Sequence, residues 1–203
     1  SVQELKAQGY DAVIVATGAN KPGTLKLEKG ETINALKFLR DFKATDGKVA
    51  LGKNVVVIGG GNTAMDTARA AKRNAGVEKV SLVYRRTKRY MPAAEDELLE
   101  VLEEGVEFKE LLSPVSLENG KLLCKKMELG SMDASGRAGV TETGETEEVL
   151  ADTVIVAVGE KVPTEFYEAN GIAVNERGKA RINDKTMETS AEGVYVVGDG
   201  ARG

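Results

Sequence analysis

The chain has 203 residues, of which 41% are hydrophobic and 30% are charged, and a net charge of −4. This composition is typical of a globular protein with a sizeable core, and it excludes a global basic footprint for nucleic acid. There is no histidine and only one cysteine, Cys124, which excludes a Ser-His-Asp triad, histidine metal ligands, and a disulfide or C-x-x-C redox pair within the chain. No apolar run reaches the roughly 18 residues of a membrane span, and we expect a cytoplasmic protein whose redox chemistry is carried by bound cofactors.

The first quarter of the chain predicts a helix over residues 2–8 and a strand over residues 12–16. The continuous apolar run of that strand is typical of burial on both faces. A polar connection follows over residues 20–31, and helical spacing of apolar residues predicts a helix over residues 32–42. Residues 44–53 are a second polar connection.

The centre predicts a buried strand over residues 54–58, the run Gly59-Gly60-Gly61, a helix over residues 63–74 and a strand over residues 79–84. Asn62 is a suitable N-cap for that helix. A basic turn follows over residues 85–89. Pro92 and the acidic residues after it predict another helix that ends at Gly105, with a strand over residues 106–109.

Residues 112–150 predict an antiparallel meander, because short apolar segments are separated by turn signals such as Asn119-Gly120. A long polar loop is expected between Gly130 and Val140. Residues 152–158 predict a buried strand that ends at Gly159, and residues 160–178 predict mixed loop and short helix. The end of the chain holds apolar segments at residues 180–182 and 192–197 and the turn Gly198-Asp199-Gly200.

The spacing Gly59-x-Gly61-x-x-Ala64 follows a strand and opens a helix, which is typical of a dinucleotide-binding turn. Gly59 permits the tight turn, Gly61 leaves room for the pyrophosphate, and Ala64 lets the helix pack close to the strand. The N-terminus of the helix directs its free N–H groups at the phosphates. The alternative is an ordinary strand–helix–strand unit with a glycine-rich turn.

The end of the second strand indicates which nucleotide is bound. An acidic residue there would accept hydrogen bonds from the ribose of NADH, but the chain has Arg85, Arg86, Lys88 and Arg89. Arginine pairs with a 2′-phosphate in bidentate fashion, so the cluster favours NADPH. NADH, or a solvated basic loop with no ligand, stays an alternative.

These motifs resemble those of the small subunit of NADPH-dependent glutamate synthase and its relatives. The likeness is carried by residues 58–66 (Ile-Gly-Gly-Gly-Asn-Thr-Ala-Met-Asp), by Tyr84-Arg85-Arg86 and by Met91-Pro92-Ala93. The relatives include the electron-input part of dihydropyrimidine dehydrogenase and oxidoreductases described as selenate reductase subunits. The resemblance implies an α/β fold in which a Rossmann-like NAD(P)-binding domain with an antiparallel meander is flanked by remnants of an FAD-binding Rossmann-like domain.

The resemblance also implies a function, the transfer of a hydride from NADPH to FAD and of electrons onward. It implies partners as well, namely the remainder of the FAD domain and an iron–sulfur or catalytic domain or subunit. The implied NADP(H) residues are Gly59, Gly60, Gly61, Asn62, Thr63, Ala64, Arg85, Arg86 and Arg89, and the implied residues of the FAD-domain turns are Thr17, Gly18, Gly159, Gly198 and Asp199.

The chain departs from that family at both ends. The glycine fingerprint for the FAD pyrophosphate would precede Ser1, and the helix expected after Asp199 is missing. We therefore expect an excised middle, with an FAD-domain flank and crossover over residues 1–44, an NAD(P)H-binding domain over 45–160 and a return segment over 161–203. Such a fragment would bind NADP(H) weakly at best, carry no FAD and have little activity alone.

Two other functions are open from the residues. One is a nucleotide-sensing module without turnover. The other is a direct NADP-dependent dehydrogenase, since Tyr84 and Lys88 have the Tyr-x-x-x-Lys spacing of some of these enzymes, although they lie at the adenosine end of the nucleotide. We assign no catalytic acid or base and no metal ligand, because Glu95 and Asp96 fit helix-start charges and Cys124 fits a packing role in its strand.

Overall fold

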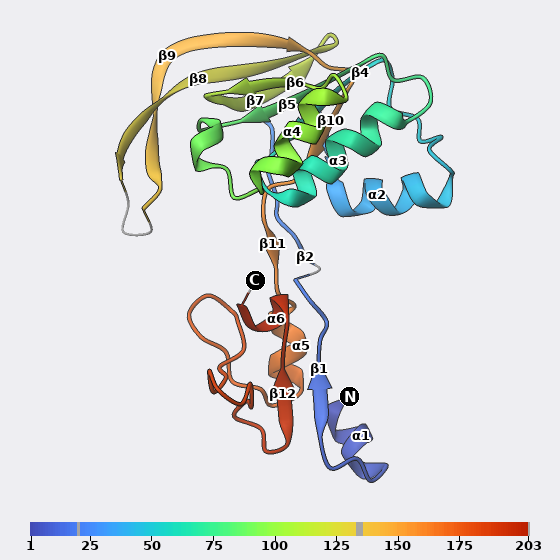
Figure 1. The fold of residues 1–203 in the computed structure, drawn as a ribbon, viewed down its shortest axis with the longest axis vertical. Helices are drawn as coiled ribbons and strands as arrows, with labels where there is room; N and C mark the ends of the chain where they lie inside the picture. Colours follow the sequence, from blue (N-terminus) through green and yellow to red (C-terminus); the bar gives the residue numbers. More distant parts are fainter. Residues whose placement is uncertain (20, 133–135, 203) are drawn as a thin grey trace. The chain divides into compact units, whose positions relative to one another are not determined.

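The computed structural model describes residues 1–19, 21–132 and 136–202. The chain divides into two compact units (Figure 1). The central unit is Pro22–Gly159, and the terminal unit combines Ser1–Lys21 with Glu160–Gly203. The chain passes between them at two short strands, β2 (Lys21–Pro22) and β11 (Glu160–Lys161). No helix in the described part of the chain has the length and apolar character that a membrane crossing requires.

A parallel sheet of five strands forms the middle of the central unit, in the order β3-β10-β4-β5-β6. Its strands are β3 (Ile33–Asn34), β4 (Asn54–Ile58), β5 (Lys79–Tyr84), β6 (Glu107–Glu110) and β10 (Thr153–Val156). Three helices join them, α2 (Ala35–Ala44), α3 (Asn62–Arg73) and α4 (Glu95–Glu103). Strand–helix–strand crossovers of this kind are the usual way to connect parallel strands.

The sheet is covered on both faces, which explains the continuous apolar runs of its strands. Val55 and Val57 of β4 pack in a core with Phe38 of α2 and Met65 of α3. Val56 of β4 faces the opposite core. That second core contains side chains of β7 (Leu112–Glu118), β8 (Lys121–Met132) and β9 (Ala138–Leu150). These three antiparallel strands form the meander, so the central unit has three layers: helices, parallel sheet and meander (Figure 1).

The terminal unit is built on two parallel strands, β1 (Val13–Val15) and β12 (Val194–Val196). Around them lie α1 (Val2–Ala7), α5 (Thr164–Ala169) and α6 (Asp199–Arg202). Its core contains the inward-facing valines of both strands and the buried Tyr167 of α5.

The α/β class, the strands β4, β5, β6 and β10 of the parallel sheet and the antiparallel meander predicted from sequence are confirmed. Four local predictions are wrong. Ile33 and Asn34 form the edge strand β3, where the start of a helix was predicted. Ile14 is 69% exposed, so in the described chain β1 is buried on one face and not on both. Strand β8 continues to Met132 and strand β9 begins at Ala138, so the loop predicted from Gly130 to Val140 is shorter than expected. The centre of that predicted loop lies outside the described residues. A helix, α6, does begin at Asp199.

The units also divide the chain at other positions than the predicted domain limits of 44/45 and 160/161. Residues 22–44 belong to the central unit, where Phe38 of α2 is fully buried. The sequence did not show this, because a polar connection over residues 20–31 precedes the helix and does not indicate to which unit that helix belongs.

Candidate functional site

The carboxyl edge of the central sheet brings together the predicted dinucleotide residues. Strands β10, β4 and β5 are parallel neighbours, and they are followed by Ala157, Gly59 and Arg85. The N–H of Gly59 donates to the carbonyl oxygen of Val83 at 3.1 Å, and the N–H of Ala157 donates to that of Ile58 at 2.8 Å. Ligands of open α/β sheets bind at this edge.

Two of the three glycines are required by packing. Gly59 has a φ of +153°, and a Cβ there would lie 2.4 Å from the carbonyl oxygen of Ala157 and 3.0 Å from the Cβ of Ala64. A Cβ on Gly60 would lie 2.5 Å from Cε2 of Tyr84. Gly61 differs, because its nearest neighbour would be Cγ of Pro92 at 3.8 Å. A Cβ on Gly61 would therefore make only an ordinary contact, so this side of the turn is uncrowded, as the approach of a phosphate would need.

The N-terminus of α3 begins at this turn, but not as predicted. The N-cap is Gly61, with φ −100° and ψ 174°, and no side-chain cap hydrogen bond is formed there by the part of the chain that the structure describes. Asn62 is the first helical residue and its Oδ1 instead accepts a hydrogen bond from the N–H of Ala94 at 3.2 Å. Thr63 and Ala64 complete the first turn, where Thr63 is half-buried and Ala64 fully buried. The prediction of Asn62 as N-cap is thus wrong, because an extended glycine fits the N-cap and frees the asparagine to reach a neighbouring loop.

The predicted arginines lie in different environments. Arg85 and Arg89 are exposed, and the guanidinium of Arg89 lies 5.9 Å from the ring centroid of Tyr90. Arg86 is half-buried, and its Nε donates to the carbonyl oxygen of Ala138 at the start of β9, at 2.7 Å. Arg86 is therefore held in place before any ligand binds, which the sequence did not indicate.

Sequence reasoning missed the structural part played by Tyr84. Its ring packs on Gly60, and its hydroxyl donates to the carbonyl oxygen of Tyr90 at 2.8 Å. This hydroxyl is therefore already engaged with the main chain, which counts against a Tyr84–Lys88 dehydrogenase pair. An aromatic residue that ends a strand just before a basic turn is the only sequence signal for this contact.

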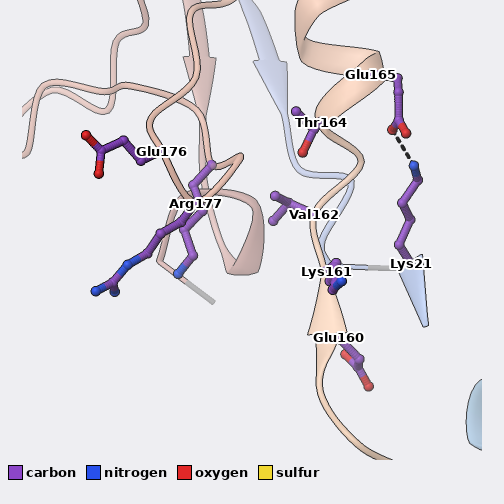
Figure 2. A pocket seen from close by; sticks show the side chains of 9 residues that line it. Lys21, Glu160, Lys161, Val162, Thr164, Glu165, Glu176 and Arg177 are labelled. Atoms are coloured by element: carbon purple, nitrogen blue, oxygen red, sulfur yellow. Dashed lines mark hydrogen bonds and ion pairs between the residues drawn. The ribbon is translucent and has the colours of Figure 1, made fainter. Parts of the chain in front are cut away.

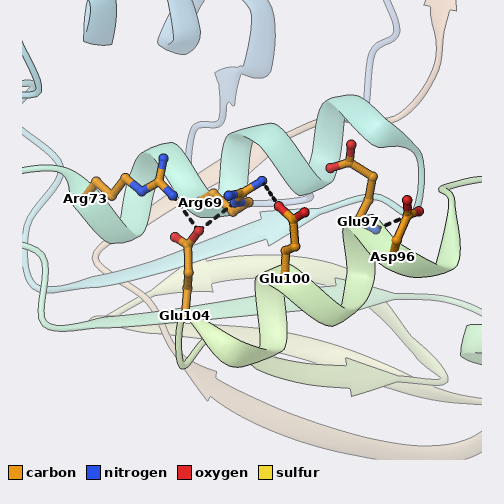
Figure 3. A network of polar contacts seen from close by, with 6 residues as sticks. All are labelled: Arg69, Arg73, Asp96, Glu97, Glu100 and Glu104. Carbon is orange, nitrogen blue, oxygen red and sulfur yellow. Dashed lines mark hydrogen bonds and ion pairs between the residues drawn. The ribbon is translucent and has the colours of Figure 1, made fainter.

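Acidic residues of α4 serve structure at the helix next to α3. Glu95 and Asp96 lie in its first turn, as predicted. Figure 3 shows Arg69 and Arg73 of α3 turned toward Glu100 of α4 and toward Glu104, the C-cap of α4. Burial opposes ionisation of Glu104, but the hydrogen bond from Arg69 and the charges of both arginines outweigh it and lower the pKa of Glu104.

The terminal unit brings its four predicted residues to one edge as well. Thr17 and Gly18 follow β1, while Gly198 and Asp199 follow β12, and the two strands are parallel. Gly18 and Gly198 have φ values of +67° and +63°, in the left-handed region that favours glycine. Thr17 and Asp199 are both exposed at these turns.

Gly159 belongs to the central unit and not to that edge. It also has a left-handed φ, of +66°, and its carbonyl oxygen accepts a hydrogen bond from the N–H of Gly23 at 2.8 Å. A Cβ at Gly23 would lie 2.5 Å from the same oxygen. The two glycines thus let the outgoing and returning chain lie close together.

A cavity of about 490 Å³ lies in the terminal unit (Figure 2). Charged side chains of both signs line it, and Lys21 is paired there with Glu165. None of the predicted site residues is among the described residues that line this cavity. We therefore place the candidate site at the strand ends and not in this cavity.

Comparison with known proteins identifies several relatives of the chain. The chain is 43% identical over its full length to the Escherichia coli (strain K12) protein YgfK, which is named as an oxidoreductase, and covers 20% of it. It is 37% identical to the NADP(+)-dependent formate dehydrogenase subunit beta of Moorella thermoacetica, with 94% of this chain and 28% of that one covered. It is 34% identical to the small chain of glutamate synthase [NADPH] of Azospirillum brasilense, with 100% and 46% covered. The chain thus spans less than half of each of these relatives, and the predicted resemblance to glutamate synthase small subunits is confirmed.

Solved structures show the same fold. FprA of Mycobacterium tuberculosis in complex with NADPH matches with a TM-score of 0.76 and 22% identity, covering 100% of this chain and 60% of that one. Thioredoxin reductase of T. acidophilum matches with a TM-score of 0.68 and 22% identity, covering 94% and 57%. The profile of one family, pyridine nucleotide-disulphide oxidoreductase, matches residues 2–203. The chain therefore belongs to the pyridine nucleotide-disulphide oxidoreductase family.

Proposed function

We propose that the central unit binds NADPH and that the chain serves a flavin-dependent oxidoreductase in which hydride passes from NADPH to FAD. The observation that carries this proposal is the turn at Gly59–Gly60–Gly61, which opens α3 at the carboxyl edge of the parallel sheet. The formate dehydrogenase and glutamate synthase relatives carry NADP or NADPH in their names, which supports the choice of nucleotide.

The residues at the turn fit a pyrophosphate. A Cβ on Gly61 would meet only Cγ of Pro92, at an ordinary contact distance of 3.8 Å, and the N-cap Gly61 has no side chain that could cap α3. The dipole of α3 favours an anion at its N-terminal end, although the N–H of Ala64 already donates to the carbonyl oxygen of Gly61 at 2.8 Å. Together these features form a site that binds phosphate through the main chain.

The basic residues beside the turn fit the additional phosphate of NADPH. Arg85 and Arg89 are exposed. The bond from Arg86 to Ala138 uses Nε, and the two terminal nitrogens of the guanidinium do not take part in it. Arginine–phosphate hydrogen bonds are charge-assisted and geometrically selective. We assign the 2′-phosphate to this cluster.

The turns of the terminal unit fit part of a flavin site. Thr17-Gly18 and Gly198-Asp199 occupy neighbouring strand ends, and Asp199 opens α6. We propose that these turns contact FAD in the longer protein, and that a further domain or subunit receives the electrons. When bound, the two cofactors supply the hydride chemistry, and the residues of this chain bind and orient them.

Titration of the protein with NADPH and with NADH tests the nucleotide assignment. Loss of one charge-assisted contact weakens binding by about tenfold or more. At least one of the three variants Arg85→Ala, Arg86→Ala and Arg89→Ala is therefore expected to raise the Kd for NADPH by about that factor. All three should leave the Kd for NADH within about twofold of its original value.

Lys43→Ala is a matched control, because Lys43 is an exposed cation in the last turn of α2, away from the carboxyl edge where that helix begins. If no arginine variant weakens NADPH more than NADH, the 2′-phosphate assignment is wrong. A sensing module without turnover is the second candidate. NADPH-dependent bleaching of the flavin in the longer protein would decide against it.

A further inference from the structure

We propose that Asn62 and Tyr84 are positioning residues that hold the basic loop, residues 85–94, against the glycine turn, residues 59–64, and so set the preference for NADPH over NADH. The selectivity part of this inference rests on the proposed function, while the tether itself is a property of the protein alone.

The basic loop needs such a tether because of its charge. Arg85, Arg86, Lys88 and Arg89 place four cations within five residues. Like charges this close repel one another and favour a spread of loop conformations. An ordered loop therefore requires contacts that offset the repulsion.

Arg86 is bonded to Ala138, and the N–H of Lys88 donates to Oε2 of Glu110 at 2.9 Å. The glycine turn and the strand beside it supply three further contacts. The hydroxyl of Tyr84 donates to the carbonyl oxygen of Tyr90 at 2.8 Å, in the middle of the loop. The N–H of Ala93 donates to the carbonyl oxygen of Gly60 at 3.0 Å, and the N–H of Ala94 donates to Oδ1 of Asn62 at 3.2 Å. Two of these three bonds come from side chains that substitution can remove.

Both side chains touch the turn and the loop at once. Asn62 is the first residue of α3, and Tyr84 has its ring against Gly60. These two residues thus join the glycine turn, which would contact the pyrophosphate, to the basic loop, which would contact the 2′-phosphate. The separation of the two phosphates is limited by the covalent structure of NADPH, so the position of the loop relative to the turn decides whether the arginines meet the second phosphate.

A loop ordered before binding loses less conformational entropy when the ligand arrives. NADH has no 2′-phosphate, so its binding does not require the loop to be ordered. Loss of the tether is therefore expected to weaken NADPH and to leave NADH nearly unchanged. One neutral hydrogen bond changes an equilibrium by roughly three- to tenfold, and we expect the ratio of the two Kd values to fall by about that factor.

The experiment compares Asn62→Ala, Asn62→Asp and Tyr84→Phe with the unmodified protein. Trypsin cleavage after Arg85, Arg86, Lys88 and Arg89 is followed by mass spectrometry without nucleotide, and the Kd values for NADPH and NADH are measured by calorimetry. Asp66→Ala is the control, since Asp66 is exposed on α3 one turn beyond Asn62.

Asn62→Ala and Tyr84→Phe should speed cleavage in the loop severalfold, because local opening exposes the chain to protease, and should lower the NADH-to-NADPH ratio of Kd values. Asn62→Asp keeps an acceptor for Ala94, so the cleavage rate and the ratio should match those of the unmodified protein. Its added negative charge at the pyrophosphate site should weaken both nucleotides by repulsion. A merely structural role would not separate the two nucleotides in this way.

Unchanged cleavage in both Asn62→Ala and Tyr84→Phe would overturn the tether, whatever the nucleotide results. Faster cleavage with an unchanged ratio of Kd values would overturn the role in selectivity. If the unmodified protein binds neither nucleotide, the proposed function fails, whereas faster cleavage in the variants would still support the tether.

Discussion

The ring of Tyr84 occupies the space that a side chain on Gly60 would need, since a Cβ there would lie 2.5 Å from Cε2 and 2.9 Å from Cζ of that ring. The ring is held by the bond from its hydroxyl to Tyr90 and is nearly buried. Gly60→Ala should therefore lower the free energy of unfolding by about 1–3 kcal/mol through overpacking. Urea denaturation measures this loss. In a Tyr84→Ala background the same substitution should cost less, and an equal cost in both backgrounds would show that the ring is not the obstacle.

Gly61→Ala should leave the fold intact. Its φ of −100° suits any residue, and the nearest atom to a new Cβ would be 3.8 Å away. The expected loss in the free energy of unfolding is about 1 kcal/mol or less, because alanine is a poorer N-cap than glycine but meets no crowded neighbour here. Urea denaturation beside Gly60→Ala gives the comparison. A loss as large as that of Gly60→Ala would mean that the space at Gly61 is filled.

The stability contributed by the ion pairs of Glu104 with Arg69 and Arg73 should depend on pH. The pKa of Glu104 is lowered from 4.5, because the hydrogen bond from Arg69 at 2.7 Å and the charge of Arg73 outweigh the opposing effect of burial. A carboxylate whose pKa is lower in the folded state stabilises the fold above its unfolded pKa and loses that contribution as the pH falls through the folded pKa.

Glu104→Gln should thus cost about 1 kcal/mol of stability at pH 7, as expected for a partly shielded ion pair. The difference from the unmodified protein should shrink as the pH falls below 4.5. Denaturation at several pH values measures this difference. Glu103→Gln is the control on the exposed face of the same helix. A difference that stays constant down to low pH would show that the charge of Glu104 is not its source.

Cys124 should be unreactive in the folded protein. Burial, with a smaller contribution from the charge of Glu147, raises the pKa of its thiol to about 12. Because the thiolate is the reactive form, labelling by a thiol reagent at pH 8 should be at least about a hundredfold slower than in urea. Equal rates with and without urea would contradict this. The family is named after disulphide chemistry, but this chain has only this one cysteine.

Most of the central fold could be predicted because the middle strands of its sheet are buried on both faces. Val55, Val56 and Val57 form a continuous apolar run, since neighbouring side chains enter the two different cores of a covered sheet. The glycine turn could be predicted for a similar reason, because its strand, turn and helix are consecutive in the chain.

Contacts between distant segments could not be predicted. Arg86 is fixed by Ala138, which lies 52 residues further along the chain, and Asn62 bonds to Ala94 instead of its own helix. The helix-capping preference of asparagine predicted that Asn62 would be the N-cap, but a neighbouring loop lies where its side chain bonds to Ala94 instead. The exposure of Ile14 likewise depends on which elements cover β1, and an apolar pattern does not carry that information.

Calorimetric titration of the unmodified protein and of Gly61→Ala with NADPH tests the central claim most directly. The turn is expected to bind pyrophosphate in the open space at Gly61, so a methyl group there should weaken NADPH at least about tenfold by blocking the phosphate. The unmodified protein should give saturable binding to one site. Equal affinity of the two proteins for NADPH, with both folded, would contradict the assignment of the glycine turn as the nucleotide site.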